Sequence, residues 1–242
     1  MSLAPRIVAA ISGNDAQHGP LPAMLLILTT VTGLVDAVSY LRLGHVFVAN
    51  MTGNIAFLGF AVADAKEFSI AASLAATAAF LLGALAGGRL GSSVGRHRGR
   101  FLATAISLEI AAIGAALLVI TLAGNPESDT VRYQLIVLLA IGMGIQNATA
   151  RRLGIPDLTT TVLTLTLTGH AADSTLAGGK NPRPGRRLLA TTTMFLGAAV
   201  GAFVIFHFGV STVLALAFVL LAASGIAACL SLQSTDAWTV GT

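Results

Sequence analysis

Eight apolar runs, most of them about 20 residues long, fill nearly the whole chain. They comprise residues 22–41, 48–63, 69–90, 101–123, 131–150, 158–178, 188–208 and 210–232. A helix needs about 20 apolar residues to cross the roughly 30 Å of hydrocarbon in a bilayer. Only 10% of the residues are charged, whereas about a quarter are charged in soluble domains. The sequence therefore predicts an all-α polytopic membrane protein with the lipid bilayer as its surroundings.

The few charged residues lie in short loops between the apolar runs. The formal net charge of +4 is therefore interpreted as a signal of membrane topology, and no nucleic acid partner is expected. The single cysteine, Cys229, lies inside an apolar run, so there is no disulfide framework. No nucleophile elbow, phosphate loop or zinc-protease helix occurs. We expect neither enzymatic activity nor a cofactor.

The chain divides into two similar halves at the polar segment 124–129. We expect an N-terminal tail at 1–20, membrane repeats at 21–124 and 125–233, and a C-terminal tail at 234–242. Similar strings follow in the same order in both repeats: Gly33-Leu-Val-Asp36-Ala37 with Gly144-Ile-Gln-Asn147-Ala148, two Arg-Leu-Gly triplets, and Gly-x-x-x-Gly pairs at Gly83/Gly87 and Gly197/Gly201. The glycine pairs predict close helix packing. The similarity indicates an internal duplication.

The basic loops suggest how the two halves are oriented. Residues 96–100, 151–152 and 180–187 carry most of the basic side chains and are expected on the cytoplasmic side. They all reach that side if runs 48–63 and 158–178 are broken, re-entrant helices. The result is a 3+3 inverted repeat of six spans plus two broken helices, with both termini cytoplasmic. The alternative is eight full spans in a parallel 4+4 repeat.

Small polar residues open each of the two candidate broken runs. Asn50, Thr52, Gly53 and Asn54 begin the first, and Thr159, Thr160 and Thr161 begin the second. Non-helical backbone at membrane depth must be buried in protein or reached by water, and many transporters place such breaks at the solute site. These residues are therefore candidates for a path through the membrane. The alternative is that the threonines bond to backbone carbonyls within an ordinary span.

Asp36 is the most informative single residue, because it lies within the first apolar run. Thr29, Thr32 and Asp36 recur at helical spacing and form one polar stripe. A carboxylate near the bilayer centre costs at least about 2.5 kcal/mol, so it should face the bundle interior, a partner or water. Its counterparts in the second half, Gln146 and Asn147, are neutral. Asp36 is a candidate proton or cation site, with a structural hydrogen-bonded role as the alternative.

Three further polar residues in apolar runs are candidates for coupling or proton relay. Glu109 shares a helix face with small alanines, which also suits a structural clasp to another helix. His170 and Asp173 are three residues apart and should face the same side of a helix, either as a relay or in a structural role. Two such ligands do not make a metal site, so no metal is expected.

The strings 35–40, 49–54, 146–148 and 158–164 resemble the YoaK-like family of bacterial multi-pass membrane proteins, a domain of unknown function. The resemblance implies a bacterial inner-membrane protein and no mechanism. From the residues we expect a transporter or channel for a small molecule or ion, with the path between the two broken helices and with proton or cation coupling as an option. A non-transporting scaffold or sensor is the alternative, and an intramembrane enzyme ranks third. Homo-oligomerisation is left open.

Overall fold

The computed structural model describes residues 18–126, 128–161, 163–180, 184–230, 232 and 237–240, so most of the two expected tails lies outside the described residues. Six of the described helices are long and apolar enough to cross a membrane. They are α2 (Leu21–Arg42), α4 (Ile70–Val94), α5 (Arg98–Ala123), α6 (Asp129–Leu153), α8 (Pro184–Phe208) and α9 (Val210–Leu230). There are also two short 3₁₀ helices among the described residues, η1 (Thr175–Ala177) and η2 (Ala237–Thr239). The prediction of an all-α polytopic membrane protein is confirmed.

Two further helices are too short to cross a bilayer. α3 (Met51–Val62) has 12 residues and α7 (Leu163–Ala172) has 10. At 1.5 Å per residue they are about 18 and 15 Å long, roughly half of the hydrocarbon thickness. Each begins later than its apolar run, because non-helical connectors precede Met51 and Leu163. The eight-span alternative is therefore excluded, and six spans with two short helices remain.

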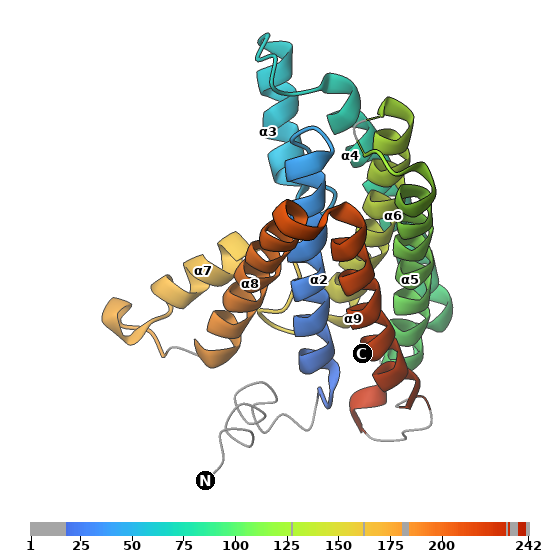
Figure 1. The fold of residues 1–242 in the computed structure, drawn as a ribbon. Helices are drawn as coiled ribbons and strands as arrows, with labels where there is room; N and C mark the ends of the chain where they lie inside the picture. Colours follow the sequence, from blue (N-terminus) through green and yellow to red (C-terminus); the bar gives the residue numbers. More distant parts are fainter. Residues whose placement is uncertain are drawn as a thin grey trace.

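The spans form a bundle in which the two halves of the chain interleave. α2 packs along α8 and α4 packs along α6, so both pairs join one half to the other. α5 packs against both α6 and α9. Successive spans run in alternate directions, with α3 toward the upper end of the bundle and α7 toward the lower end (Figure 1). α2 is consequently surrounded by spans of the second half.

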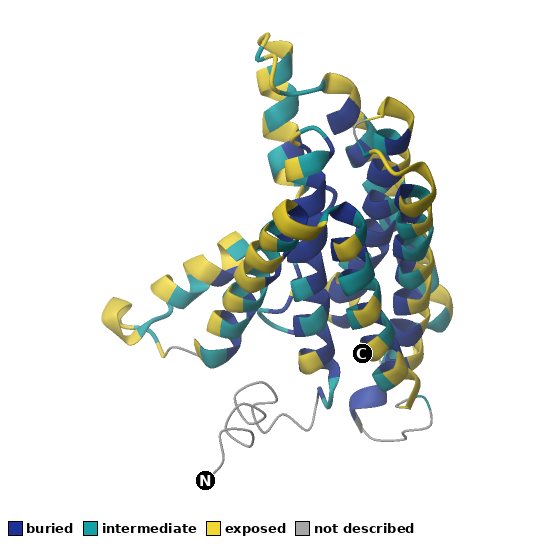
Figure 2. Cartoon of the chain, in the orientation of Figure 1, coloured by how far each residue is buried: buried dark blue, intermediate teal, exposed yellow. Residues whose placement is uncertain are grey.

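The burial pattern is that of a protein in lipid. α2 is the most buried span, and the outer faces of the surrounding helices are exposed (Figure 2). Those faces carry large apolar side chains such as Leu82, Phe195 and Phe203, each at least half exposed. So much exposed apolar surface is unfavourable in water and favourable against hydrocarbon. The bundle therefore presents its apolar exterior to the bilayer.

Glycines bring the two interleaved helix pairs into backbone contact. A Cβ added at Gly83 on α4 would lie 2.2 Å from the carbonyl oxygen of Ile141 on α6, and one added at Gly197 on α8 would lie 2.3 Å from that of Thr30 on α2. Any side chain at these positions would separate the helices. One turn further on, Gly87 meets Ala148 and Gly201 meets Ala37 in the same way. The two crossings are thus made by the glycine pairs that the sequence places at matching positions of the two predicted repeats.

Candidate functional site

A non-helical connector leads from α2 into α3. The side chain of Asn54 hydrogen-bonds both the N–H and the carbonyl oxygen of one connector residue, Phe47. The N–H of Phe47 donates to Oδ1 of Asn54 at 2.8 Å, and Nδ2 of Asn54 donates to the carbonyl oxygen of Phe47 at 2.6 Å. Asn54 is 1% exposed. An unpaired backbone group buried among apolar side chains would cost several kcal/mol. Asn54 therefore replaces the helical hydrogen bonds that the interruption removes.

Asp36 stabilises the same connector from the side of α2. Its Oδ1 accepts a hydrogen bond from the N–H of Ala49 at 3.1 Å, and its side chain is buried. The hydroxyls of Thr29 and Thr32 bond to carbonyl oxygens one turn back in α2. The predicted polar stripe is thus buried, and the carboxylate of Asp36 contacts backbone.

The connector before α7 is arranged in a related way. Asn147, the predicted counterpart of Asp36, accepts a hydrogen bond from the hydroxyl of Thr161 and donates to the carbonyl oxygen of Met143 at 2.8 Å. Thr160 has a φ of 61°, a left-handed conformation that few residues other than glycine adopt, and its buried hydroxyl has no hydrogen-bond partner among the described residues. In both halves a side chain of the preceding span therefore contacts the connector.

A cavity lies between the first turns of the two short helices. Its volume is about 530 Å³. The lining residues are Ala49, Asn50, Met51, Thr52, Gly53 and Ala56 from the first connector and α3, Thr161, Leu163 and Thr164 from the second connector and α7, and Phe80, Asn147 and Met194 from the spans. We call it the inner cavity. It brings together residues that are more than a hundred positions apart in sequence.

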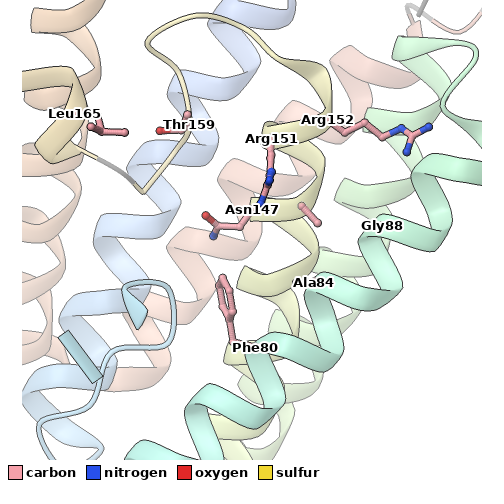
Figure 3. A pocket seen from close by; sticks show the side chains of 9 residues that line it. Phe80, Ala84, Gly88, Asn147, Arg151, Arg152, Thr159 and Leu165 are labelled. Carbon is pink, nitrogen blue, oxygen red and sulfur yellow. The ribbon is translucent and has the colours of Figure 1, made fainter. Parts of the chain in front are cut away.

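A second cavity of about 830 Å³ lies toward the end of α6 (Figure 3). We call it the outer cavity. Its lining comprises Phe80, Ala84, Gly88, Asn147, Ala148, Arg151, Arg152, Thr159 and Leu165. Phe80 and Asn147 line both cavities and therefore lie between them. The two cavities are therefore neighbours at contacts between the two halves of the chain.

An ion-pair cluster fixes the far end of α7 to the start of α8. Arg187 is buried; its Nε donates to Oδ1 of Asp157 at 3.0 Å and its Nη2 to Oδ2 of Asp173 at 2.8 Å. Nη1 donates to the carbonyl oxygen of Gly169. The guanidinium thus joins the connector, α7 and α8. Asp173 is bound to Arg187, and the buried Nδ1 of His170 has no hydrogen-bond partner in the described part of the chain.

Three buried polar side chains lie away from the cavities. Glu109 on α5 is 1% exposed, packs against Gly142 of α6, and its Oε1 has no hydrogen-bond partner among the described residues. Nε2 of Gln146 donates to the hydroxyl of Thr32 at 2.8 Å, which joins α6 to α2. Ser224 on α9 is fully buried. Glu109 and Gln146 therefore lie at helix contacts inside the bundle.

The predicted path residues fall into three groups. Asn50, Thr52, Gly53, Asn147 and Thr161 line the inner cavity, and Thr159 lines the outer one. Asp36, Asn54, Gln146 and Thr160 do not line either cavity, and the first three hydrogen-bond to backbone or to a neighbouring helix.

Sequence reasoning missed two arginines. Arg151 and Arg187 were interpreted only as topology charges, although one lines the outer cavity and the other is buried in an ion-pair cluster. A signal was present for Arg151, since it follows Asn147 by one helical turn and must share its face.

The fold and the cavities define a polytopic α-helical membrane protein with two short helices beside two neighbouring cavities. A family model described as "Protein of unknown function (DUF1275)" matches residues 24–227, and the chain belongs to this family. It is also 35% identical over 150 residues to the "UPF0700 transmembrane protein YoaK" of Bacillus subtilis (strain 168). That match covers 62% of this chain and 65% of the relative. No solved structure matches the chain.

Proposed function

We propose that the protein is a transporter or channel for a small solute or ion, whose path runs through the inner and outer cavities. The observation that carries the proposal is the inner cavity itself, because the first turns of both short helices line it together with Asn147. Half-helices that end at a cavity inside the membrane are a recurrent way to bind solutes in transporters. The side chains of Asn50, Thr52 and Thr164 make no hydrogen bond in the described part of the chain, which leaves them available to a solute. The proposal assigns no catalysis to the protein.

The two halves are proposed to form an inverted repeat. The matched contacts of Gly83 with Ile141 and of Gly197 with Thr30 support a pseudo-two-fold relation. Gly33 and Gly144, also equivalent in sequence, approach the backbones of α8 and α4. Three spans per half give the halves opposite directions in the membrane (Figure 1). A site at the interface of two such halves can open alternately to either side by rocking of one half.

The basic residues support a cytoplasmic assignment for one end of the bundle. Arg98 donates to the carbonyl oxygen of Leu153, and Arg152 lies against Gly91 and Gly95, so the α4–α5 link and the end of α6 are adjacent. Short loops rich in arginine are retained in the cytoplasm. We therefore propose an inner-membrane location in a bacterium, with the ends of α2 and α9 nearest the termini on the cytoplasmic side.

Solute entry into proteoliposomes tests the proposal. Vesicles are shifted into sodium phosphate, sodium succinate, glycine or potassium chloride, and swelling is followed by stopped-flow light scattering. Thr164→Phe places a large side chain in the inner cavity, whereas Thr168→Phe makes the same change one turn further along α7, outside the lining. The wild type should admit at least one of the solutes faster than empty vesicles do. Thr164→Phe should reduce that rate at least tenfold and Thr168→Phe less than twofold.

Two results would contradict the proposal. If the wild type admits none of the four solutes, the scaffold or sensor alternative is favoured. If Thr164→Phe and Thr168→Phe reduce entry equally, the path does not pass through the inner cavity. Circular dichroism and gel filtration of both variants establish that they are folded, since both positions are exposed.

A further inference from the structure

The outer cavity carries positive charge and no negative charge. Arg151 and Arg152 are its only charged lining residues among those described, and no Asp or Glu lines the inner cavity either. The nearby acids of the second half, Asp157 and Asp173, are both paired with Arg187. The charge at the end of α6 is therefore not neutralised by these carboxylates, and it adjoins a cavity large enough for a small molecule.

Arg151 differs from the neighbouring Arg98 and Arg152 in what its side chain does. Arg98 satisfies a carbonyl oxygen at the end of α6, and Arg152 packs over the glycines of α4. Arg151 makes no hydrogen bond or ion pair with any described residue. Figure 3 shows the side chain of Arg151 next to that of Asn147, whereas the side chain of Arg152 points away from Asn147 toward α4. A topology signal requires only a positive charge in the loop, and does not require that the side chain line a cavity.

We propose that the outer cavity binds an anion, the carboxylate or phosphate group of a small molecule, and that Arg151 is the residue that binds it. A guanidinium donates two parallel hydrogen bonds to either group. The hydroxyl of Thr159 lies across the same cavity, and Asn147 and Phe80 separate the bound anion from the inner cavity. The inference deepens the proposed function, because it assigns the chemical class of solute to the same route.

The inner cavity is also compatible with a negatively charged solute. α3 and α7 both begin at it, and the first turn of a helix carries partial positive charge from its unpaired N–H groups. Its lining side chains are neutral hydroxyl, amide and apolar groups. An anion moving from Arg151 past Asn147 therefore meets no carboxylate among the described lining residues.

Two sources present the same anionic chemistry to Arg151. One is a soluble carboxylate or phosphate. The other is the headgroup of an anionic lipid. The lining of the outer cavity includes apolar side chains, and one of them, Leu165, is 73% exposed, so a lipid could reach the cavity from the bilayer. The experiment must therefore offer both.

Binding to purified protein tests the inference without requiring flux. Inorganic phosphate and succinate are titrated by calorimetry against the protein in neutral detergent at constant ionic strength, and in a separate arm the protein is mixed with phosphatidylglycerol or phosphatidylcholine vesicles. Arg151→Gln is compared with Arg89→Gln, which removes the same charge from an exposed position on α4 outside both cavities. Wild type and Arg89→Gln should bind phosphate or succinate alike, and Arg151→Gln should raise the Kd at least tenfold.

Each outcome decides one point. Loss of phosphate or succinate binding only in Arg151→Gln identifies a soluble anion, whereas an equally selective loss of phosphatidylglycerol binding identifies a lipid headgroup. Absence of anion binding to the wild type, or equal losses in both variants, overturns the inference. If the protein binds no anion but glycine or potassium entry is still reduced by Thr164→Phe, the anion site is refuted and the transport proposal is supported. If the protein binds an anion but no solute enters the vesicles, the transport proposal is refuted and the anion site is supported.

Discussion

Substitution of Gly83 by alanine tests the close crossing of α4 and α6 directly. The added Cβ would lie 2.2 Å from the carbonyl oxygen of Ile141, whereas ordinary contact begins at 3.4 Å. The obstructing atom belongs to the backbone, which cannot move aside by changing a rotamer, so the two helices must separate by about 1 Å. A gap of that size loses roughly a quarter to a half of the dispersion energy at the contact. Overpacking of this kind costs about 1–3 kcal/mol.

Gly88 provides the matched control on the same helix. A Cβ added there meets no atom within 4 Å. Both substitutions gain about 1 kcal/mol of helix propensity, so this term cancels in the comparison. Gly83→Ala should therefore be less stable than Gly88→Ala by about 1–3 kcal/mol. Gly197→Ala should resemble Gly83→Ala, because its Cβ would lie 2.3 Å from the carbonyl oxygen of Thr30.

Unfolding in mixed micelles measures the difference. Helix content is followed by circular dichroism as the mole fraction of SDS rises, and the midpoints of the three variants are compared with the wild type. Gly88→Ala should unfold at or above the wild-type midpoint, and the other two below it. Equal midpoints for Gly83→Ala and Gly88→Ala would refute the backbone contact, and with it the packing that positions Phe80 and Asn147 at the cavities.

Two further predictions concern the connectors. Asn54→Ala leaves the N–H and the carbonyl oxygen of Phe47 unpaired, so it should lower the free energy of unfolding by about 2–4 kcal/mol in the same micelle assay. Asn54→Asp should lose only part of this free energy. An unchanged unfolding midpoint for Asn54→Ala would contradict the role of Asn54. Arg187→Gln removes the ion pairs with Asp157 and Asp173, and it should accelerate amide hydrogen exchange in α7 at least tenfold with exchange in α3 unchanged. Equal effects on both helices would refute a local clamp.

The bundle was predictable because length and charge dominate the behaviour of a helix in a membrane. Runs 48–63 and 158–178 were separable from the spans by polar residues at their starts and by the loop charges alone. The structure confirms that both contain short helices, α3 and α7. Both distinctions depend on the length, hydropathy and charge of consecutive residues, which can be read directly from the sequence.

The roles of individual polar residues were less accessible. Asn50 and Asn54 belong to one short string, yet the first lines the inner cavity and the second bonds to Phe47. Which side of the helix each faces depends on where α3 begins, and helix boundaries are weakly encoded in local sequence. The cluster of Arg187 joins residues from three separate segments, so it arises only from tertiary packing.

The two halves hold their short helices by different interactions. α3 is held by Asn54 and by stacked rings, including Phe47 with Phe57 and Phe57 with Phe68. α7 has no such ring cluster among the described residues and is held mainly by Arg187, whose partner Asp173 is half exposed. Water and salt weaken an ion pair with an exposed carboxylate, because they compete for its charged groups. Stacked rings have no charged groups for which water or salt can compete. In the proposed repeat the spans are therefore matched and the short helices are not, and we expect α7, beside the outer cavity, to respond more strongly than α3 to water and ions.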